Sequence, residues 1–163
     1  MHRSSPIRLG VALGSITLLV ALVPTAIAAT PRKDAGYEGV TSQKSGTANL
    51  PVNARVSKDG TKVQRFNIQW NSKCDDPARV APFGLSVPRN MTLSKAGSFG
   101  YKSVDTRNFP DGSKTLFTSE LKGKFTKKTL AKGTFKVDIS IRNAAGAQIG
   151  TCTTGTINWQ VRD

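Results

Sequence analysis

The stretch ELKGKFTKKTLAKGTFKVDISIRN, residues 120–143, decides the fold because apolar and polar residues alternate along it with a period of two. In residues 115–126 the odd positions carry the apolar side chains Phe117, Leu121 and Phe125. In residues 130–142 the odd positions again carry them: Ala131, Phe135, Val137, Ile139 and Ile141. This alternation predicts two β-strands, each with one face on the core and the other in water.

The register of the resulting hairpin follows from the same parity. Both apolar faces point the same way only if the numbers of opposed residues add up to an even number. A register that fits places Lys124 opposite Lys132 and Glu120 opposite Lys136. The first pair is unfavourable and the second favourable, each by roughly a few tenths of a kcal/mol, so neither decides the register alone.

The same alternation recurs elsewhere in the chain. It places apolar side chains on one face in residues 50–56, 66–70 and 157–161, and a further strand is expected at residues 98–104. Turns are predicted at Asp59-Gly60, at 110–112 and at 143–146. Residues 75–90 contain three prolines, so loops and short edge strands are expected between residues 75 and 111. The chain is therefore predicted to be all-β, a single-domain antiparallel sandwich of seven or eight strands.

The N-terminal residues carry the pattern of a secretory signal. Arg3 and Arg8 precede an uncharged apolar run over residues 9–23, and small residues at 26–29 offer a cleavage site. The alternative is an uncleaved membrane anchor, but the run is shorter than the roughly 20 residues that span a bilayer. We expect a signal peptide at 1–29, a flexible leader at 30–35 and the β domain at 36–163. The protein is then secreted, in the extracellular space or associated with the cell envelope.

The charge balance and the cysteines support an extracellular role. The full chain has a formal charge of +14, and removal of Arg3 and Arg8 leaves 22 − 10 = +12. This charge predicts attraction to anionic surfaces. Cys74 and Cys152 are the only two cysteines, so they are expected to form a disulfide in an oxidising compartment. Cys152 is out of phase with Ile149 and Ile157, which predicts a bulge near Gly150 or Gly155.

Four segments of the chain carry a resemblance to known proteins: GYEGVTSQ, VSKDGTKVQRFNIQWNSKC, ELKGKFTKKTLAKGTFKV and TCTTGTINWQ. Together they resemble a group of uncharacterised secreted bacterial β-rich proteins, and the resemblance extends from Gly36 to about Gln160. It implies export, β-architecture and the cysteine pair. It implies no activity and no site.

Catalysis finds little support in the residues. The only histidine, His2, lies in the predicted signal, so a Ser-His-Asp triad is excluded from the exported chain. Ser119 and Lys122 match a Ser-x-x-Lys spacing, but residues three apart on a strand point to opposite faces. The carboxylates of the predicted loops are expected to form turns: Asp75, Asp76, Asp105 and Asp111. We expect no catalytic residue, metal site or cofactor, and keep a hydrolase that uses loop carboxylates as a weak alternative.

The basic residues of the hairpin are the remaining candidate site. They would share one exposed surface: Lys122, Lys124, Lys127, Lys128, Lys132, Lys136 and Arg142. Such a face could bind acidic cell-wall polymer, acidic polysaccharide or extracellular DNA. Sequence-specific recognition of nucleic acid is not expected, because Phe125 and Phe135 face inward and cannot stack on bases. The other interpretation, and the first expectation, is a solvated face that keeps the sheet soluble and blocks edge-to-edge pairing. The protein is then a non-catalytic β-sandwich module of the cell envelope or extracellular space with a structural or interaction role, and polyanion binding is the alternative.

Overall fold

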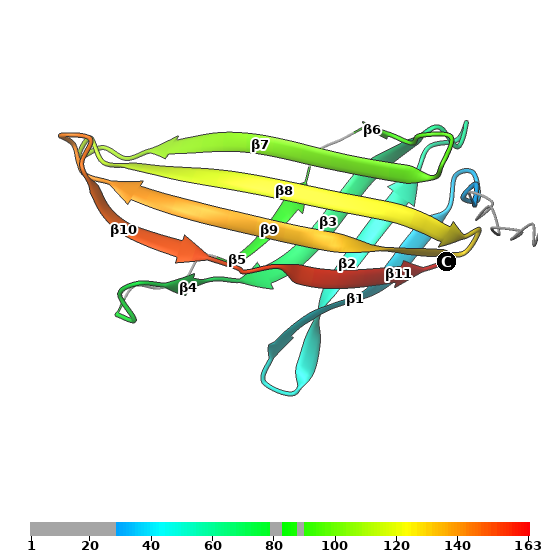
Figure 1. The fold of residues 1–163 in the computed structure, drawn as a ribbon, viewed down its shortest axis with the longest axis horizontal. Coiled ribbons are helices and arrows are strands. Elements are labelled where there is room, and N and C mark those ends of the chain that lie inside the picture. The colour runs from blue at the N-terminus through cyan, green and yellow to red at the C-terminus, as the bar shows by residue number, and fades with distance from the viewer. Residues whose placement is uncertain (1–28, 79–82, 88–89) are drawn as a thin grey trace, which may run out of the picture.

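Figure 1 shows the computed structural model of the chain, which describes residues 29–78, 83–87 and 90–163. The predicted signal peptide lies outside these residues, except for Ala29. All regular structure in the described residues is β, in strands β1 (Gly36–Ser45), β2 (Ala48–Val56), β3 (Lys62–Asn71), β4 (Lys73–Cys74), β5 (Phe83–Val87), β6 (Met91–Thr92), β7 (Ser98–Asn108), β8 (Lys114–Lys127), β9 (Leu130–Arg142), β10 (Gln148–Thr153) and β11 (Ile157–Arg162). Within this part of the chain no helix is long and apolar enough to span a membrane.

The strands form a single antiparallel sheet in which β9 is central. On one side β9 pairs with β8, and β8 pairs with β7. On the other side the two halves of β9 pair with β11 and β10, and β11 leads on to β1, β2 and β3. In Figure 1, β7, β8 and β9 lie side by side while β2 and β3 cross behind them at a steep angle. The sheet is therefore strongly curled, and its concave face encloses the core.

The sheet is curled so far that β3, near one end of the path, lies next to β4 at the other end. Only Ser72 separates β4 from β3, yet β4 pairs with β10, next to β9, whereas β3 pairs with β2. At this junction the side chain of Gln43 replaces missing backbone pairs. Its Nε2 donates to the carbonyl oxygens of Asn71 (2.9 Å) and Thr154 (3.3 Å), and its Oε1 accepts from the Asn71 N–H (2.8 Å). Gln43 thus connects β1, the β3–β4 bend and the segment between β10 and β11.

Truncation of Gln43 is expected to destabilise this junction. Gln43→Ala leaves the Asn71 N–H without the acceptor that it has here, so the free energy of unfolding should fall by about 1–2 kcal/mol. Gln69→Ala is the matched control, because Gln69 is an exposed glutamine of β3. Urea unfolding followed by tryptophan fluorescence measures both. Equal stability of the two variants would show that Gln43 contributes nothing to the junction.

Aromatic rings fill the core over a pair of glycines. Gly123 of β8 lies opposite Gly133 of β9. On its other side Gly123 lies opposite Phe99 of β7, and Gly133 lies opposite Trp159 of β11. A Cβ on Gly123 would overlap the ring of Phe99, and a Cβ on Gly133 would overlap the ring of Trp159. The two ring centroids are 6.0 Å apart. The rings therefore fold inward over the bare backbone of the glycine pair.

The structure confirms the all-β class, the antiparallel pairing, the disulfide and the hairpin register. Lys124 lies opposite Lys132, and Glu120 lies opposite Lys136. The division into two sheets is not confirmed, because the eleven strands are hydrogen-bonded into one sheet. There are more strands than the seven or eight predicted because bends divide β3 from β4 and β10 from β11. Short strands β5 and β6 add to the total in the proline-rich region.

The disulfide joins β4 to β10, where Cys74 and Cys152 are directly opposed. The predicted bulge is present, because the pairing of β9 with β10 shifts register between Gln148 and Gly150. This shift leaves Ile149 exposed and turns Cys152 inward, where it is 3% exposed. The crosslink thus holds the place where the curled sheet meets itself.

Residues 30–35, the predicted leader, contact the domain. The Asp34 N–H donates to the Ser57 carbonyl (3.0 Å), and the Asp34 carboxylate pairs with Arg55 (2.8 Å). This ion pair holds the pKa of Asp34 below its usual value. Arg32 pairs with Asp163 at the other end of the chain (2.8 Å).

Candidate anion-binding face

The candidate face is the convex, outward side of β7, β8 and β9. The odd-numbered residues of β8 and β9 point inward, so the even-numbered ones face solvent. Along β8 these include Lys114, Lys122 and Lys124, and along β9 they include Lys132 and Lys136, with Arg142 at the strand end. All six side chains are exposed, which was predicted for all of them but Lys114.

A carboxylate lies in the middle of this face and neutralises part of it. The Glu120 Oε1 is 2.7 Å from the Lys122 Nζ and 3.3 Å from the Lys102 Nζ. Lys122 and Lys102 hold the pKa of Glu120 below its usual value. Lys102 belongs to β7, directly opposite Glu120. The charge of Lys122 is therefore shared with a neighbouring acid rather than free for a ligand.

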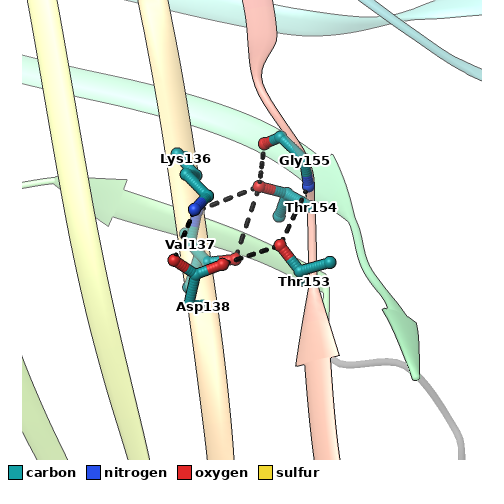
Figure 2. A network of polar contacts seen from close by, with 6 residues as sticks. All are labelled: Lys136, Val137, Asp138, Thr153, Thr154 and Gly155. Carbon is teal, nitrogen blue, oxygen red and sulfur yellow. Dashed lines mark hydrogen bonds and ion pairs between the residues drawn. The ribbon is translucent and has the colours of Figure 1, made fainter. Parts of the chain in front are cut away.

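Lys136 is held by a second acid, as Figure 2 shows. Its Nζ lies 2.7 Å from Asp138, whose Oδ1 also accepts from the Thr153 hydroxyl (2.8 Å). Burial raises the pKa of Asp138, but the bonds from Lys136 and Thr153 outweigh burial and lower it overall. Next to this pair, the Thr154 Oγ1 accepts from the Val137 N–H (2.9 Å). The network fixes the segment between β10 and β11 against β9.

Four lysines lie together at the hairpin end and have no carboxylate partner among the described residues. We call them the lysine patch: Lys124, Lys127, Lys128 and Lys132. Lys124 and Lys132 are direct cross-strand neighbours, Lys127 is the last residue of β8, and Lys128 belongs to the adjoining turn. The turn is anchored because the Tyr37 hydroxyl donates to the Lys128 carbonyl (2.8 Å). Within the described part of the chain, this is where the predicted site residues concentrate positive charge.

Arg142 does not belong to this cluster. It lies opposite Lys114 at the far end of the same face. Ten residues of β9 separate it from Lys132, which corresponds to about 33 Å along a strand. The predicted stripe is thus divided into the lysine patch, a central region of ion pairs and a distal cationic pair. Between the central region and the distal pair lies a shallow groove of about 570 Å³.

Two basic residues of this face were not among the predicted site residues. Lys102 lies on β7 and Lys114 at the start of β8. The predicted turn at 110–112 was enough to place Lys102 on this face. A β7–β8 hairpin centred on Asp111 puts Lys102 opposite Glu120, as the structure does. Lys114 lies opposite Arg142, which follows from the β8–β9 register already deduced.

The residues considered for catalysis lie apart from one another, except for the sequence neighbours Asp75 and Asp76, and Asp75 borders a groove that Asp138 also lines. Ser119 is buried and Lys122 is exposed, on opposite faces of β8, as the strand geometry predicts. Asp111 accepts from the Ser113 N–H (2.9 Å) and Asp105 from the Ser103 hydroxyl (2.7 Å), so each binds close to its own position in the chain. The bonds from Ser113 lower the pKa of Asp111. Among the described residues no three Asp, Glu, His or Cys side chains are grouped to hold a metal ion.

Comparison with known proteins adds no family to this picture. The chain matches no protein-family model, no curated protein and no solved structure.

Proposed function

We propose that the protein is a secreted, non-catalytic β module that binds anionic polymers outside the cell through the lysine patch. One observation carries the proposal: Lys124 is directly opposed to Lys132, and neither forms an ion pair with a carboxylate of the described residues. Like charges in direct cross-strand positions are destabilising. The apolar faces fix this register, and a bound polyanion would remove the repulsion that it leaves on the outward face, which supports a ligand there.

The shape of the face favours a polymer over a small anion. The patch lies on the outward side of a curled sheet, and of its four lysines only Lys128 lines a pocket in the described part of the chain, together with Arg32 and Lys33. A long polyanion can instead contact the four lysines one after another and release condensed counterions as it binds. The net charge of +12 expected after signal removal adds long-range attraction. The disulfide suits an extracellular location, because such bonds persist in oxidising compartments.

A hydrolase that uses loop carboxylates remains the weaker alternative. It needs two carboxyl groups facing each other across a substrate groove. Asp105, which lies in β7 rather than in a loop, and Asp111 are instead bonded to serines two residues away. Asp75 and Asp138 do border one groove, but each accepts a hydrogen bond from a threonine of β10. Loss of turnover on changing a single loop aspartate would favour the hydrolase over the binding module.

The lysine patch is tested by removing its charge. In the variant Lys124→Gln, Lys127→Gln, Lys128→Gln, Lys132→Gln, binding to polyglutamate is expected to weaken strongly. If all four lysines replace counterions, wild-type affinity falls roughly a hundredfold between about 50 and 200 mM salt. The variant should lose most of that dependence. Affinity measured across a salt series by fluorescence anisotropy gives both quantities.

The matched control removes four charges from another surface. Lys44, Lys58, Lys62 and Arg65 lie on β1, β3 and the β2–β3 turn, and all four are exposed. Changing them to Gln lowers the net charge equally. If both variants lose the same affinity and salt dependence, only net charge matters and the patch is a solvated face. Absence of polyanion binding by the wild type would reject the proposed function outright.

A further inference from the structure

A shallow groove lies on the same outward face as the lysine patch, further along β8 and β9. Its volume is about 570 Å³, and four strands contribute to it: β4, β8, β9 and β10. The cross-strand row Thr118, Asp138, Thr153 and Lys73 runs across it. Ser140 and Thr151 form the next row, also directly opposed. The groove thus exists because β4 extends the sheet beyond β10 at the disulfide.

The lining of the groove is rich in hydroxyl groups. Thr118, Ser140, Thr151 and Thr153 each contribute one, and Asp75 and Asp138 contribute carboxylates. The carboxylates are held in place: Asp75 Oδ2 accepts from the Thr151 N–H (2.9 Å), and Asp138 Oδ1 accepts from Thr153 (2.8 Å). Three of the hydroxyls donate within the protein: Thr153 to Asp138, Thr151 to Asp75 (3.3 Å) and Ser140 to Gln148 (2.9 Å). Their remaining lone pairs and the ionised carboxylates are acceptors for the hydroxyl groups of a ligand. This combination suits a ligand that itself carries many hydroxyl groups.

Positive charge borders the groove in both directions along the strands. Toward the hairpin end lie Lys136 and then the lysine patch, and toward the other end Lys114 lies opposite Arg142. Lys73 adds a cation at the β4 side. A ligand that follows β8 and β9 would meet cations, then hydroxyls and carboxylates, then cations again. The face therefore combines sites for acidic groups with a site for hydroxyl groups.

We infer that the polymer bound by this face is an acidic polysaccharide, with its sugar hydroxyls in the groove and its acidic groups on the lysine patch and on the Lys114–Arg142 pair. This inference rests on the proposed function and names its ligand class. Single-stranded nucleic acid fits less well, because it binds through bases stacked on exposed aromatic rings. The phenylalanines of β8 and β9 point inward, with Phe125 and Phe135 at most 1% exposed.

The groove is tested separately from the patch by removing hydroxyls without changing charge. The variant Thr118→Val, Ser140→Ala, Thr151→Val keeps every lysine and every carboxylate. Thr106→Val, Thr126→Val, Thr134→Val is the matched control, because these threonines lie on β7, β8 and β9 outside the groove. The probes are polygalacturonate, which carries carboxylates and hydroxyls, polyglutamate, which carries carboxylates alone, and single-stranded DNA.

The groove variant is expected to bind polygalacturonate about tenfold more weakly than the wild type, because three hydrogen-bonding groups are lost. Its polyglutamate affinity should be unchanged, and the fluorescence of the buried Trp70 and Trp159 shows that the variant is folded. The control variant should bind both as the wild type does. Unchanged polygalacturonate affinity in the groove variant would overturn the inference while leaving the proposed function intact. Wild-type preference for single-stranded DNA over polygalacturonate would overturn it as well, and absence of binding to every probe would reject both.

Discussion

Replacing Cys74 and Cys152 together by alanine is expected to lower the free energy of unfolding by about 4 kcal/mol. The disulfide closes a loop of 78 residue steps, and in the chain-entropy model a crosslink of this span restricts the unfolded chain by about that amount. Alanine is the appropriate replacement because Cys152 is buried, and a serine hydroxyl there would lack solvent. A loss of this size is large against the total stability of about 5–15 kcal/mol that is typical of a domain.

The measurement is urea unfolding of the oxidised wild type and of the double variant, followed by the fluorescence of the buried Trp70 and Trp159. Wild type unfolded in the presence of a reductant is the control, and its midpoint should approach that of the variant. A difference below about 1 kcal/mol between oxidised and reduced protein would contradict the prediction. It would mean that β4 is held to β10 by its backbone pairing and by Gln43 rather than by the crosslink.

Gly133→Ala is expected to cost about 3 kcal/mol of stability, at the upper end of the usual range for overpacking. The added Cβ would overlap the Lys122 carbonyl oxygen and the Trp159 ring, whose Cε2 would lie 2.7 Å away. Neither neighbour moves easily, because one is backbone of the paired strand and the other packs against Phe66 at a centroid distance of 5.0 Å. The strands of the hairpin would have to separate or the aromatic cluster to repack.

Gly36→Ala is the control for this change. Gly36 is also a strand glycine, but a Cβ there would meet no atom within 4 Å. Thermal unfolding of the two variants should therefore separate them, with Gly36→Ala close to the wild type. If Gly133→Ala unfolds at the same temperature as Gly36→Ala, the packing of Phe99 and Trp159 does not depend on glycine at positions 123 and 133.

The sequence was most informative where strands alternate regularly. The parity of residues 115–142 correctly predicted the β8–β9 register, because one face of each strand is almost uniformly apolar. The bulge before Cys152 was also predictable, since Ile149 and Cys152 cannot otherwise both obey the alternation. The position of Lys102 was also predictable, because the turn at 110–112 aligns β7 with β8.

The closure of the sheet was not predictable in the same way. The bend at Ser72 contains no proline or glycine, and the partners that define it are Gln43 and Thr154, far away in the sequence. Pairing of β4 with β10 depends on the total curl of the five strand pairings that lead from β10 to β3 rather than on a local signal. The groove depends on this closure, so its hydroxyl lining could not be assembled from sequence. The glycine pair was visible in the sequence, but the rings that require it become apparent only in three dimensions.

The pairing of β1 with β11 has a consequence for how the chain folds. Glu38 lies opposite Arg162, so the first described strand completes its hydrogen bonds only with the last one. During synthesis, β1 leaves the ribosome long before β11 is made, and it cannot reach its final place until then. Contacts so distant in sequence make folding slow, because a long loop must close before they form. The local hairpins β7–β8 and β8–β9 can form early, whereas the complete curled sheet forms only after the whole chain has emerged.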